Sequence, residues 1–305
     1  MYIFLGPTLS LSEARNILPD ATYLPPVQCG DLLRVVTQQP KVIAIIDGTF
    51  EQNAAVWHKE ILYCLKQGVA VYGASSMGAL RAAECNVFGM KGMGEVYEYY
   101  RQGMDTDDDE VALIHSPSPD YIALSEPLVN IRATLQQALD MNIIDKALHD
   151  VFIKQAKETY YPDRSFAMFS SAPLQDWLAA GHAVDVKKQD AIQLLTHLRD
   201  HTGEHSLPSF EFNQSIYFRL LKQSLTHQPS LLDFIPLLNQ SAAPQTAREF
   251  SEAYIADFSR RFRKQRALHE KSVFVNWLSD HQLSIDDYEQ LIRFYLAYYY
   301  QSLDA

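Results

Sequence analysis

Residues 41–49 read KVIAIIDGT, and residues 69–80 read VAVYGASSMGAL. The first stretch is rich in β-branched residues, which suits a strand buried on both faces of a sheet. The second passes from a strand through a turn of small residues into a helix. Residues 58–67, between the two strands, carry apolar side chains on one stripe and predict a helix that ends at Gly68. The order strand, helix, strand predicts a parallel sheet, because parallel neighbours need a crossover connection.

The same alternation extends toward the N-terminus. Residues 2–5 and 22–24 predict two further strands, and a helical segment follows each of them. Ser10 or Ser12 is the N-cap that we expect for the first of these helices. The fold class that follows is α/β, with a Rossmann-like, doubly wound parallel sheet as its core.

After residue 94 the pattern changes from strands to helices. Apolar residues recur at helical spacing in six segments, which are 124–139, 143–160, 174–180, 189–198, 250–278 and 286–303. We therefore expect an α/β core over residues 1–135 and an all-helical C-terminal extension over residues 136–305. Residues 241–245 are the clearest linker.

Composition excludes several classes of protein. Of the 305 residues, 47% are hydrophobic and 21% are charged, as in an ordinary globular chain, so a disordered or collagen-like protein is excluded. No apolar run approaches the roughly 18–20 residues that a membrane-spanning helix needs. The first six residues lack the basic segment of a secretory signal, and we expect the protein to be cytoplasmic.

Charge and cysteine content argue against nucleic acids and structural metals as partners. A net charge of −11 disfavours general nucleic-acid binding, which depends on neutralising phosphates. The three cysteines, Cys29, Cys64 and Cys85, are widely spaced and form no C-x-x-C motif. We expect them to be small buried or half-buried side chains rather than a zinc site or disulfides. We also expect no metal and no cofactor.

Three polar clusters have an ordinary explanation beside a functional one. Residues 105–110 read DTDDDE but lack the glycine and glutamate of a calcium loop, so they predict a solvated loop or a docking patch for a basic partner. His197, His201 and His205 recur every four residues, but a glycine between the last two interrupts the helix that a metal site would need. Residues 260–266 form a basic cluster, which is either a solvated face or a contact for an acidic partner or nucleic acid.

Three loops follow strand ends and should lie along one edge of the sheet, where ligands bind in doubly wound folds. They are Gly6-Pro7-Thr8, Asp47-Gly48-Thr49 and Ser75-Ser76-Met77-Gly78. An aspartate at the end of a buried strand orients a catalytic base, binds a metal, or makes an Asx-turn with the glycine after it. This edge is the site that the pattern predicts.

The turn at residues 74–78 is the clearest catalytic motif. Small residues two positions before and two positions after Ser76 fit a nucleophile elbow. The backbone N–H groups of Met77 and Gly78 open a helix and can bind an oxyanion. The alternative is a tight turn in which Ser76 only caps the helix. The turn lacks the first glycine of G-x-S-x-G and the lysine of a phosphate-binding loop.

His58, Lys59 and Glu60 open the helix that follows the Asp47 loop. Neighbouring helical residues differ by about a hundred degrees, so only one or two of these side chains can face a cleft together. His58 fits a general base, and Lys59 fits an activator of serine or an anion ligand. Otherwise the three are surface and capping charges.

Several ungapped motifs, taken in order, resemble the TfuA family. They are FLGPTL at residues 4–9, IIDGTF at 45–50, VWHKEIL at 56–62, GASSMGALRAAE at 73–84, DDDEVA at 107–112 and LSEPLVNIR at 124–132. The resemblance covers about residues 1–200. Residues 200–305 lie outside it.

The resemblance implies a protein that works beside YcaO enzymes, which use ATP to activate backbone amides. TfuA-like partners support thioamide formation, and the task implied for them is sulfur delivery. A small ThiS-like carrier is recruited, and its thiocarboxylate is hydrolysed to release bisulfide.

Thiocarboxylate hydrolysis needs a nucleophile or an activated water, a base and an oxyanion site, and the motif residues offer candidates for these roles. Ser75 or Ser76 would supply the nucleophile of the hydrolysis. His58 or Lys59 would act as base, oriented by Asp47. Arg81 would hold a carboxylate or an anionic carrier tail. The candidate residues for binding a ligand or anion are Gly6, Thr8, Gly48, Met77, Gly78, Arg81 and Glu84.

Two other functions stay open. A non-catalytic binding module would dock to a YcaO protein or to its substrate peptide, through the acidic loop or the helical half. A freestanding hydrolase would act on a substrate without sulfur.

Overall fold

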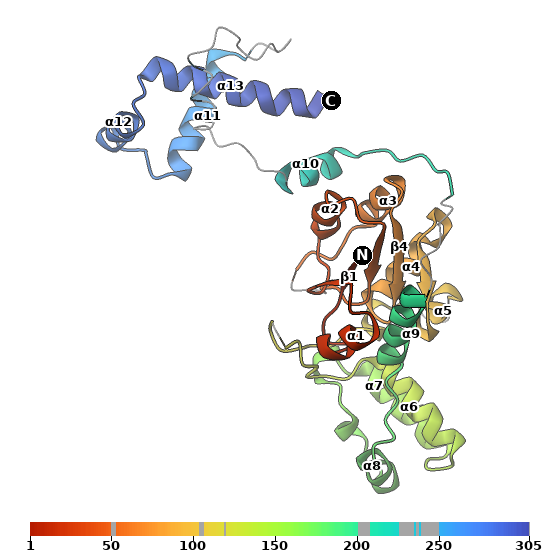
Figure 1. Ribbon diagram of the computed structural model, residues 1–305. Coiled ribbons are helices and arrows are strands. Elements are labelled where there is room, and N and C mark those ends of the chain that lie inside the picture. Colours follow the sequence, from red (N-terminus) through yellow and green to blue (C-terminus); the bar gives the residue numbers. More distant parts are fainter. Residues whose placement is uncertain are drawn as a thin grey trace. The chain divides into compact units, whose positions relative to one another are not determined.

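The computed structural model describes residues 1–49, 53–103, 107–118, 120–200, 208–225, 235, 238 and 250–304, without the side chains of residues 223, 224, 265 and 298–304. The chain divides into two compact units, Met1–Gln214 and Ser215–Ala305 (Figure 1). The boundary expected between residues 135 and 136 falls within a helix of the first unit. No helix in the described ranges is both long and apolar enough to cross a membrane.

Five parallel strands form one sheet in the first unit, which confirms the α/β fold (Figure 1). The strands are β1 Tyr2–Phe4, β2 Thr22–Leu24, β3 Val42–Ile45, β4 Ala70–Ala74 and β5 Lys91–Met93. Their spatial order is β2-β1-β3-β4-β5, so the sheet grows outward in both directions from β1 and β3, as in a doubly wound fold. The sequence does not predict β5, because this strand has only three residues and includes a lysine and a glycine.

The strand register aligns the carboxyl ends of the three central strands. Phe4 pairs with Ile45, and Ile45 pairs with Gly73. The loops after β1, β3 and β4 therefore begin at one edge of the sheet. This is the edge where doubly wound folds bind their ligands.

Helices cover both faces of the sheet (Figure 1). Helices α1 (Leu11–Ile17) and α9 (Val186–Asp200) share a hydrophobic core with alternate strand residues such as Ala44 and Tyr72. The other face is covered by four helices, which are α2 Asp31–Val36, α3 His58–Lys66, α4 Met77–Cys85 and α5 Glu95–Arg101. Helix α9 thus returns to the sheet after three intervening helices.

Those three helices build a separate core within the first unit. They are α6 Leu128–Asp140, α7 Lys146–Glu158 and α8 Ala172–Ala179. Leu135 and Phe152 lie near the centre of this core, together with Phe169. Short 3₁₀ helices complete the unit, which are η1 Asn86–Phe88, η2 Asp108–Glu110, η3 Tyr161–Asp163 and η4 Phe166–Met168.

The acidic run before α6 is in part an internal structure. Glu110 is fully buried and pairs with Arg132, at 2.7 Å between Oε1 and Nη2. Arg164 is also buried and donates hydrogen bonds to the backbone oxygen and the carboxylate of Asp109. The prediction of a solvated loop is therefore wrong at Glu110. Residues 105–106 lie outside the described residues.

The described residues of the C-terminal unit are mostly helical. The helices are α10 Ile216–Leu225, α11 Glu252–Gln265, α12 Lys271–Asp280 and α13 Ile285–Asp304. The uninterrupted helical pattern predicted over residues 250–278 is wrong, because the chain leaves the helical conformation at Ala267, whose φ is +55°. The linker expected at residues 241–245 and the side chains of residues 298–300 lie outside the description.

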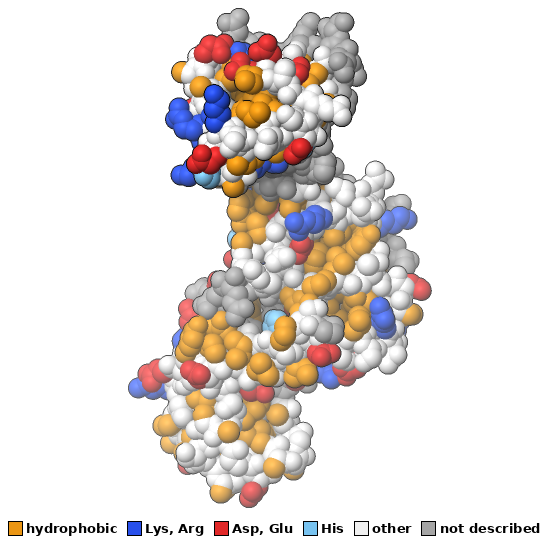
Figure 2. Space-filling view, turned by 90° about the vertical axis from the view of Figure 1, so that its left-hand side faces the viewer, with side chains coloured by type: hydrophobic (Ala, Val, Ile, Leu, Met, Phe, Trp, Pro, Cys, Tyr) orange, Lys and Arg blue, Asp and Glu red, His pale blue; other side chains and the backbone are white. Residues whose placement is uncertain are grey.

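The basic cluster on α11 packs largely against its own unit. Arg260 and Arg261 both pair with the carboxylate of Asp257. The guanidinium groups of Arg263 and Arg266 lie over aromatic rings, at 5.0 Å and 4.7 Å from the ring centroids. Figure 2 shows Lys and Arg side chains, in blue, gathered at one side of this unit. These contacts favour an ordinary charged face.

Close packing of α4 on the sheet depends on Gly78. A Cβ atom on this residue would lie 1.8 Å from the backbone oxygen of Ile45, the last residue of the central strand β3. We expect Gly78→Ala to lower the free energy of unfolding by about 3 kcal/mol or more, measured by urea denaturation. Gly68→Ala is the matched control, because a Cβ there meets no atom within 4 Å. Its φ of +81° accounts for an expected cost of about 1 kcal/mol. Equal stability of the two variants would contradict this account of the packing.

Candidate functional site

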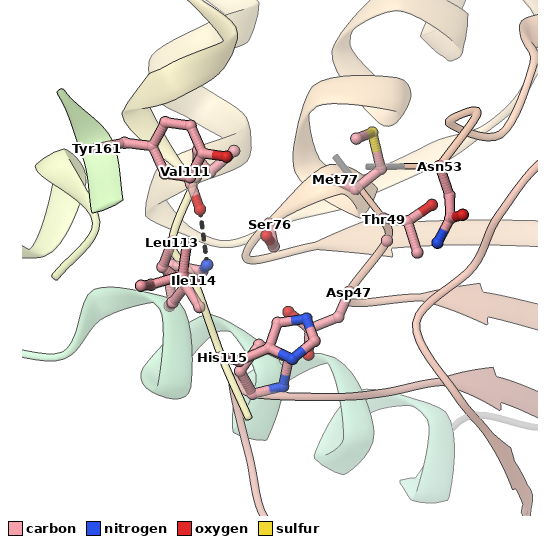
Figure 3. A pocket seen from close by; sticks show the side chains of 14 residues that line it. Asp47, Thr49, Asn53, Ser76, Met77, Val111, Leu113, Ile114, His115 and Tyr161 are labelled. Atoms are coloured by element: carbon pink, nitrogen blue, oxygen red, sulfur yellow. Dashed lines mark hydrogen bonds between the residues drawn. The ribbon is translucent and has the colours of Figure 1, made fainter. Parts of the chain in front are cut away.

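A small cavity lies at the carboxyl ends of β3 and β4 (Figure 3). Its volume is about 140 Å³, close to that of a roughly 150 Å³ cavity that holds a benzene molecule. Figure 3 shows Ser76 in the middle of the view, with Asp47 and Met77 on one side and Leu113 and Tyr161 on the other. The strand-end loops therefore meet segments that lie far away in sequence, and the space between them suits a small acyl or anionic group.

Asp47 anchors the loop after β1 to the end of β3. Its Oδ2 accepts hydrogen bonds from the backbone N–H groups of Gly6 and Thr8, at 2.8 Å and 3.2 Å. Its Oδ1 accepts a hydrogen bond from the Thr8 hydroxyl at 2.6 Å. Asp47 is only 2% exposed and lines the cavity. The structure thus brings Gly6, Thr8 and Asp47 together, and the carboxylate serves the β1 loop rather than an Asx-turn with Gly48.

Ser75 continues this chain of hydrogen bonds. It is fully buried, and its hydroxyl donates to Thr8 Oγ1 at 3.3 Å. Its φ is +70°, which strains a residue other than glycine and marks the sharp turn from β4 into α4. Ser75 is not among the residues that line the cavity. Its hydrogen bond holds the Thr8 hydroxyl, which in turn donates to Asp47, and it makes this contact outside the cavity.

Ser76 is the serine that faces the cavity. It occupies the N-cap position of α4, yet its side chain makes no capping hydrogen bond. The explanation of Ser76 as a helix cap is therefore not supported, and the hydroxyl is available to a ligand. Of the two amides expected to bind an oxyanion, that of Gly78 donates to Ile46 O at 3.3 Å. The amide of Met77 has no backbone acceptor within the described part of the chain and lies beside the cavity.

Lys187 is a cavity residue that the sequence analysis misses. It belongs to the first turn of α9, is 2% exposed, and donates from Nζ to Val111 O at 2.8 Å. Burial lowers the pKa of this ammonium group, and the carboxylates of Asp47, Asp185 and Glu126 offset part of that effect. A buried lysine that lines the same cavity as a serine is suited to binding and activating an anionic acyl group.

The helical spacing of α9 holds the signal that identifies Lys187. Lys187, Ala191, Leu194 and Leu198 recur at intervals of three or four residues and form the buried stripe of the helix. A lysine on such a stripe needs a partner or a cavity, because an isolated buried charge is costly. His115, another cavity residue that the sequence analysis misses, gives no such signal, because it stands in an irregular segment.

One segment of the chain supplies most of this cavity. Residues 47–165 match the family model of the TfuA-like protein. This segment is TfuA-like. It contains Asp47, Ser76 and His115, whereas α9 supplies Lys187 from beyond it. The family resemblance seen in the sequence is confirmed over these residues. No curated protein matches the chain.

Four other expected site residues of the TfuA-like segment lie outside the cavity, and three of them contact one another. His58 Nε2 and Arg81 Nη1 each lie 2.7 Å from Glu84 Oε2. Burial alone would raise the pKa of Glu84, but hydrogen bonds from His58 and Arg81 lower it on balance. Lys59 is engaged elsewhere, because its Nζ donates to Asn213 O at 2.7 Å. These four charged side chains are not among the residues that line the cavity.

Glu60 is a buried helix cap with a shifted pKa. Its carboxylate accepts the backbone N–H groups of Trp57 at 3.1 Å and Gly30 at 2.8 Å. Burial raises its pKa from the ordinary 4.5 to about 7. The folded chain therefore holds this proton after the unfolded chain has released it, and stability falls as pH rises through this window, by about 3 kcal/mol at most.

Glu60→Gln should show a smaller decline of stability with pH than the wild type. Urea denaturation at about pH 5 and about pH 7.5 measures the difference. Asp190 contributes a decline of the same sign in both proteins, because burial raises its pKa to about 6. An equal decline in both proteins would show that Glu60 does not titrate in this window.

The cysteines are free thiols and offer no activated nucleophile. Cys64 and Cys85 are buried and Cys29 is half-buried, as predicted. Burial raises the pKa of Cys29 to about 11 and that of Cys85 to about 12. Both groups therefore remain protonated near neutral pH, and neither is a thiolate.

Of the three regularly spaced histidines, the structure describes only His197. His197 packs its ring against Tyr72, with 5.9 Å between the ring centroids. His201 and His205 lie outside the described residues. Within the ranges that the structure describes, no group of three or more His, Cys, Asp or Glu side chains is placed to hold a metal ion.

Proposed function

We propose that this TfuA-like chain releases bisulfide from a small ThiS-like carrier protein by hydrolysing the thiocarboxylate at the carrier's C-terminus. The observation that carries the proposal is the presence of Ser76 and Lys187 in one small cavity at the start of α4. The family supports the choice of substrate, because TfuA-like proteins work beside YcaO enzymes that form backbone thioamides. The bisulfide would supply the sulfur of that thioamide.

The charge of the cavity fits this substrate. A thiocarboxylate is an anion before the reaction, and it gains a second negative charge when its carbonyl carbon is attacked. The site must therefore supply positive potential where oxygen and sulfur become negative. Lys187 and the N-terminus of α4 supply it. A bound anion also favours the ammonium form of Lys187, which opposes the effect of burial on its pKa.

Ser76 is the nucleophile in this mechanism. Its Oγ forms a bond with the carbonyl carbon, the C–S bond breaks, and the serine proton leaves on the sulfur as HS⁻. The acyl ester of Ser76 is neutral, so the single negative charge of the thiocarboxylate passes to bisulfide. Water then cleaves the ester, which frees the serine hydroxyl and leaves a carboxylate on the carrier.

Asp47 and Thr8 shape the site rather than react. The Asp47 carboxylate already accepts three hydrogen bonds from Gly6 and Thr8. Its role is to fix the β1 loop and to balance the charge of Lys187. Ser75 holds the Thr8 hydroxyl from the other side. A site whose polar groups are fixed in advance needs little reorganisation during the reaction.

Release of bisulfide tests the proposal. The purified protein is mixed with an excess of a thiocarboxylated ThiS-like carrier, and free bisulfide is followed over time with a sulfide-reactive dye. We expect several bisulfide ions per protein molecule, and none from the same carrier with an ordinary carboxylate. Binding of the carrier without release of bisulfide would contradict the proposed hydrolysis. It would support a non-catalytic binding module.

A further inference from the structure

The cavity also contains a histidine. His115 lines it together with Ser76, Asp47 and Lys187, and Figure 3 shows the His115 ring on the same side of the view as Asp47. We propose that His115 is the general base, which takes the proton of the Ser76 hydroxyl and passes it to the departing sulfur. The assignment rests on the proposed hydrolysis.

A short hairpin holds the backbone of His115 in place. The backbone N–H of Ser116 donates to Ile122 O at 2.8 Å. The backbone N–H of Leu124 donates to Ile114 O, also at 2.8 Å. These two hydrogen bonds involve the residues directly before and after His115. The histidine is therefore fixed on both sides, although it lies outside the regular strands of the sheet.

A hydrogen bond also fixes the tautomer of His115. Its Nδ1 lies 2.7 Å from the backbone oxygen of Ser116. A carbonyl oxygen only accepts hydrogen bonds, so Nδ1 carries the hydrogen and Nε2 of the neutral ring keeps its lone pair. The ring packs edge-on against Tyr121, with 5.5 Å between ring centroids. The imidazole thus has a defined basic nitrogen and little freedom to turn.

Other titratable side chains share the cavity with His115. They are Asp47 from the loop after β3, Tyr161 from η3 and Lys187 from α9. A carboxylate and an ammonium group therefore share the cavity with the imidazole that is to accept and donate a proton.

His58, the histidine expected from the sequence, lacks this placement. Its Nε2 lies 2.7 Å from Glu84 Oε2, within hydrogen-bond distance, and its side chain is 49% exposed. It does not line the cavity. His58 therefore provides a matched control, because it is a histidine of the same TfuA-like segment with no contact to the proposed reaction.

The proton is conserved through both halves of the reaction. In the first half, Nε2 takes the proton from Ser76 Oγ as the C–O bond forms, and the imidazolium gives it to sulfur as the C–S bond breaks. In the second half, Nε2 takes a proton from the attacking water and returns it to Ser76 Oγ as the ester bond breaks. The carboxylic acid so formed loses its proton to solvent. No oxidant or reductant is needed.

The test compares His115→Asn with His58→Gln in the bisulfide assay. Asparagine keeps an N–H group near the position of Nδ1 but offers no base. We expect His115→Asn to lower kcat by about 10²–10⁴-fold and to remove the acid limb of the wild-type pH–rate profile. Added imidazole should restore part of the rate. His58→Gln should stay within about twofold of the wild type.

The outcomes separate this assignment from the proposed function. A His115→Asn protein with the wild-type rate and pH profile would overturn the assignment and leave the hydrolysis standing. An equal loss of rate at every pH, with the acid limb intact, would show that His115 only supports the structure and would overturn the assignment as well. If the unaltered protein releases no bisulfide, the proposed function fails and the assignment fails with it.

Discussion

Lys187→Met is expected to reduce bisulfide release by about 10²–10³-fold, the usual effect of removing one strong electrostatic contact to a developing charge. Lys187 lines the cavity, and its Nζ lies 2.8 Å from Val111 O. Methionine has a similar length and no charge, so the shape of the cavity is kept while its positive potential is lost. The loss should fall on kcat, because the negative charge of the substrate increases in the transition state.

Lys188→Met is the matched control for this variant. Lys188 is the next residue of α9, and its Nζ lies 2.7 Å from Glu13 Oε1 in a half-exposed ion pair. Its loss should cost at most about 1 kcal/mol of stability and leave the rate unchanged. Urea denaturation of both variants separates a defect of the reaction from a defect of the fold. A folded and fully active Lys187→Met protein would show that the buried lysine takes no part in the reaction.

Ser76→Ala is expected to lower kcat by at least about 10³-fold, because it removes the nucleophile itself. The Ser76 side chain makes no capping hydrogen bond, so the free energy of unfolding should change by less than about 0.5 kcal/mol. Intact-mass spectrometry of the wild type during turnover should also detect the acyl ester with the carrier, and this species should be missing from Ser76→Ala.

Ser75→Ala distinguishes the two neighbouring serines. The Ser75 hydroxyl is buried, donates to Thr8 Oγ1 and does not line the cavity. Alanine should therefore cost about 1 kcal/mol of stability and keep most of the activity. The opposite pattern, with activity kept in Ser76→Ala and lost in Ser75→Ala, would move the nucleophile to the strained position of the turn.

The central strands are predictable from the sequence because burial on both faces leaves few alternatives. Strands β3 and β4 are almost entirely buried, and their β-branched and small apolar residues fit a strand better than a helix. Strand β5 lies at the edge of the sheet and is not predicted, since its three residues have no pattern of their own. The break between α11 and α12 contains neither proline nor glycine, so only packing determines it.

The candidate site is predictable only where it follows strand ends. Asp47 and Ser76 come directly after β3 and β4, so the parallel sheet places them at one edge. Lys187 and His115 reach the same cavity from segments whose position depends on the packing of α6 and α9 against the core. Residue spacing along the chain cannot show that distant segments share one cavity. It suggested His58 and Lys59, which do not line the cavity. A charged residue on the buried stripe of a helix, such as Lys187 on α9, is therefore the better sequence signal for a distant site residue.

Hydrolysis in water enriched in heavy oxygen tests the central claim most directly. A thiocarboxylated carrier is incubated in excess with the purified protein, and its mass is followed over time. We predict complete conversion to a carboxylate that contains heavy oxygen from the solvent, and no conversion above background with Ser76→Ala or Lys187→Met. Free bisulfide, counted in the same incubation against the carboxylate formed, distinguishes hydrolysis from transfer of the sulfur to the protein. A carrier that keeps its sulfur throughout incubation with the folded wild-type protein would contradict the account.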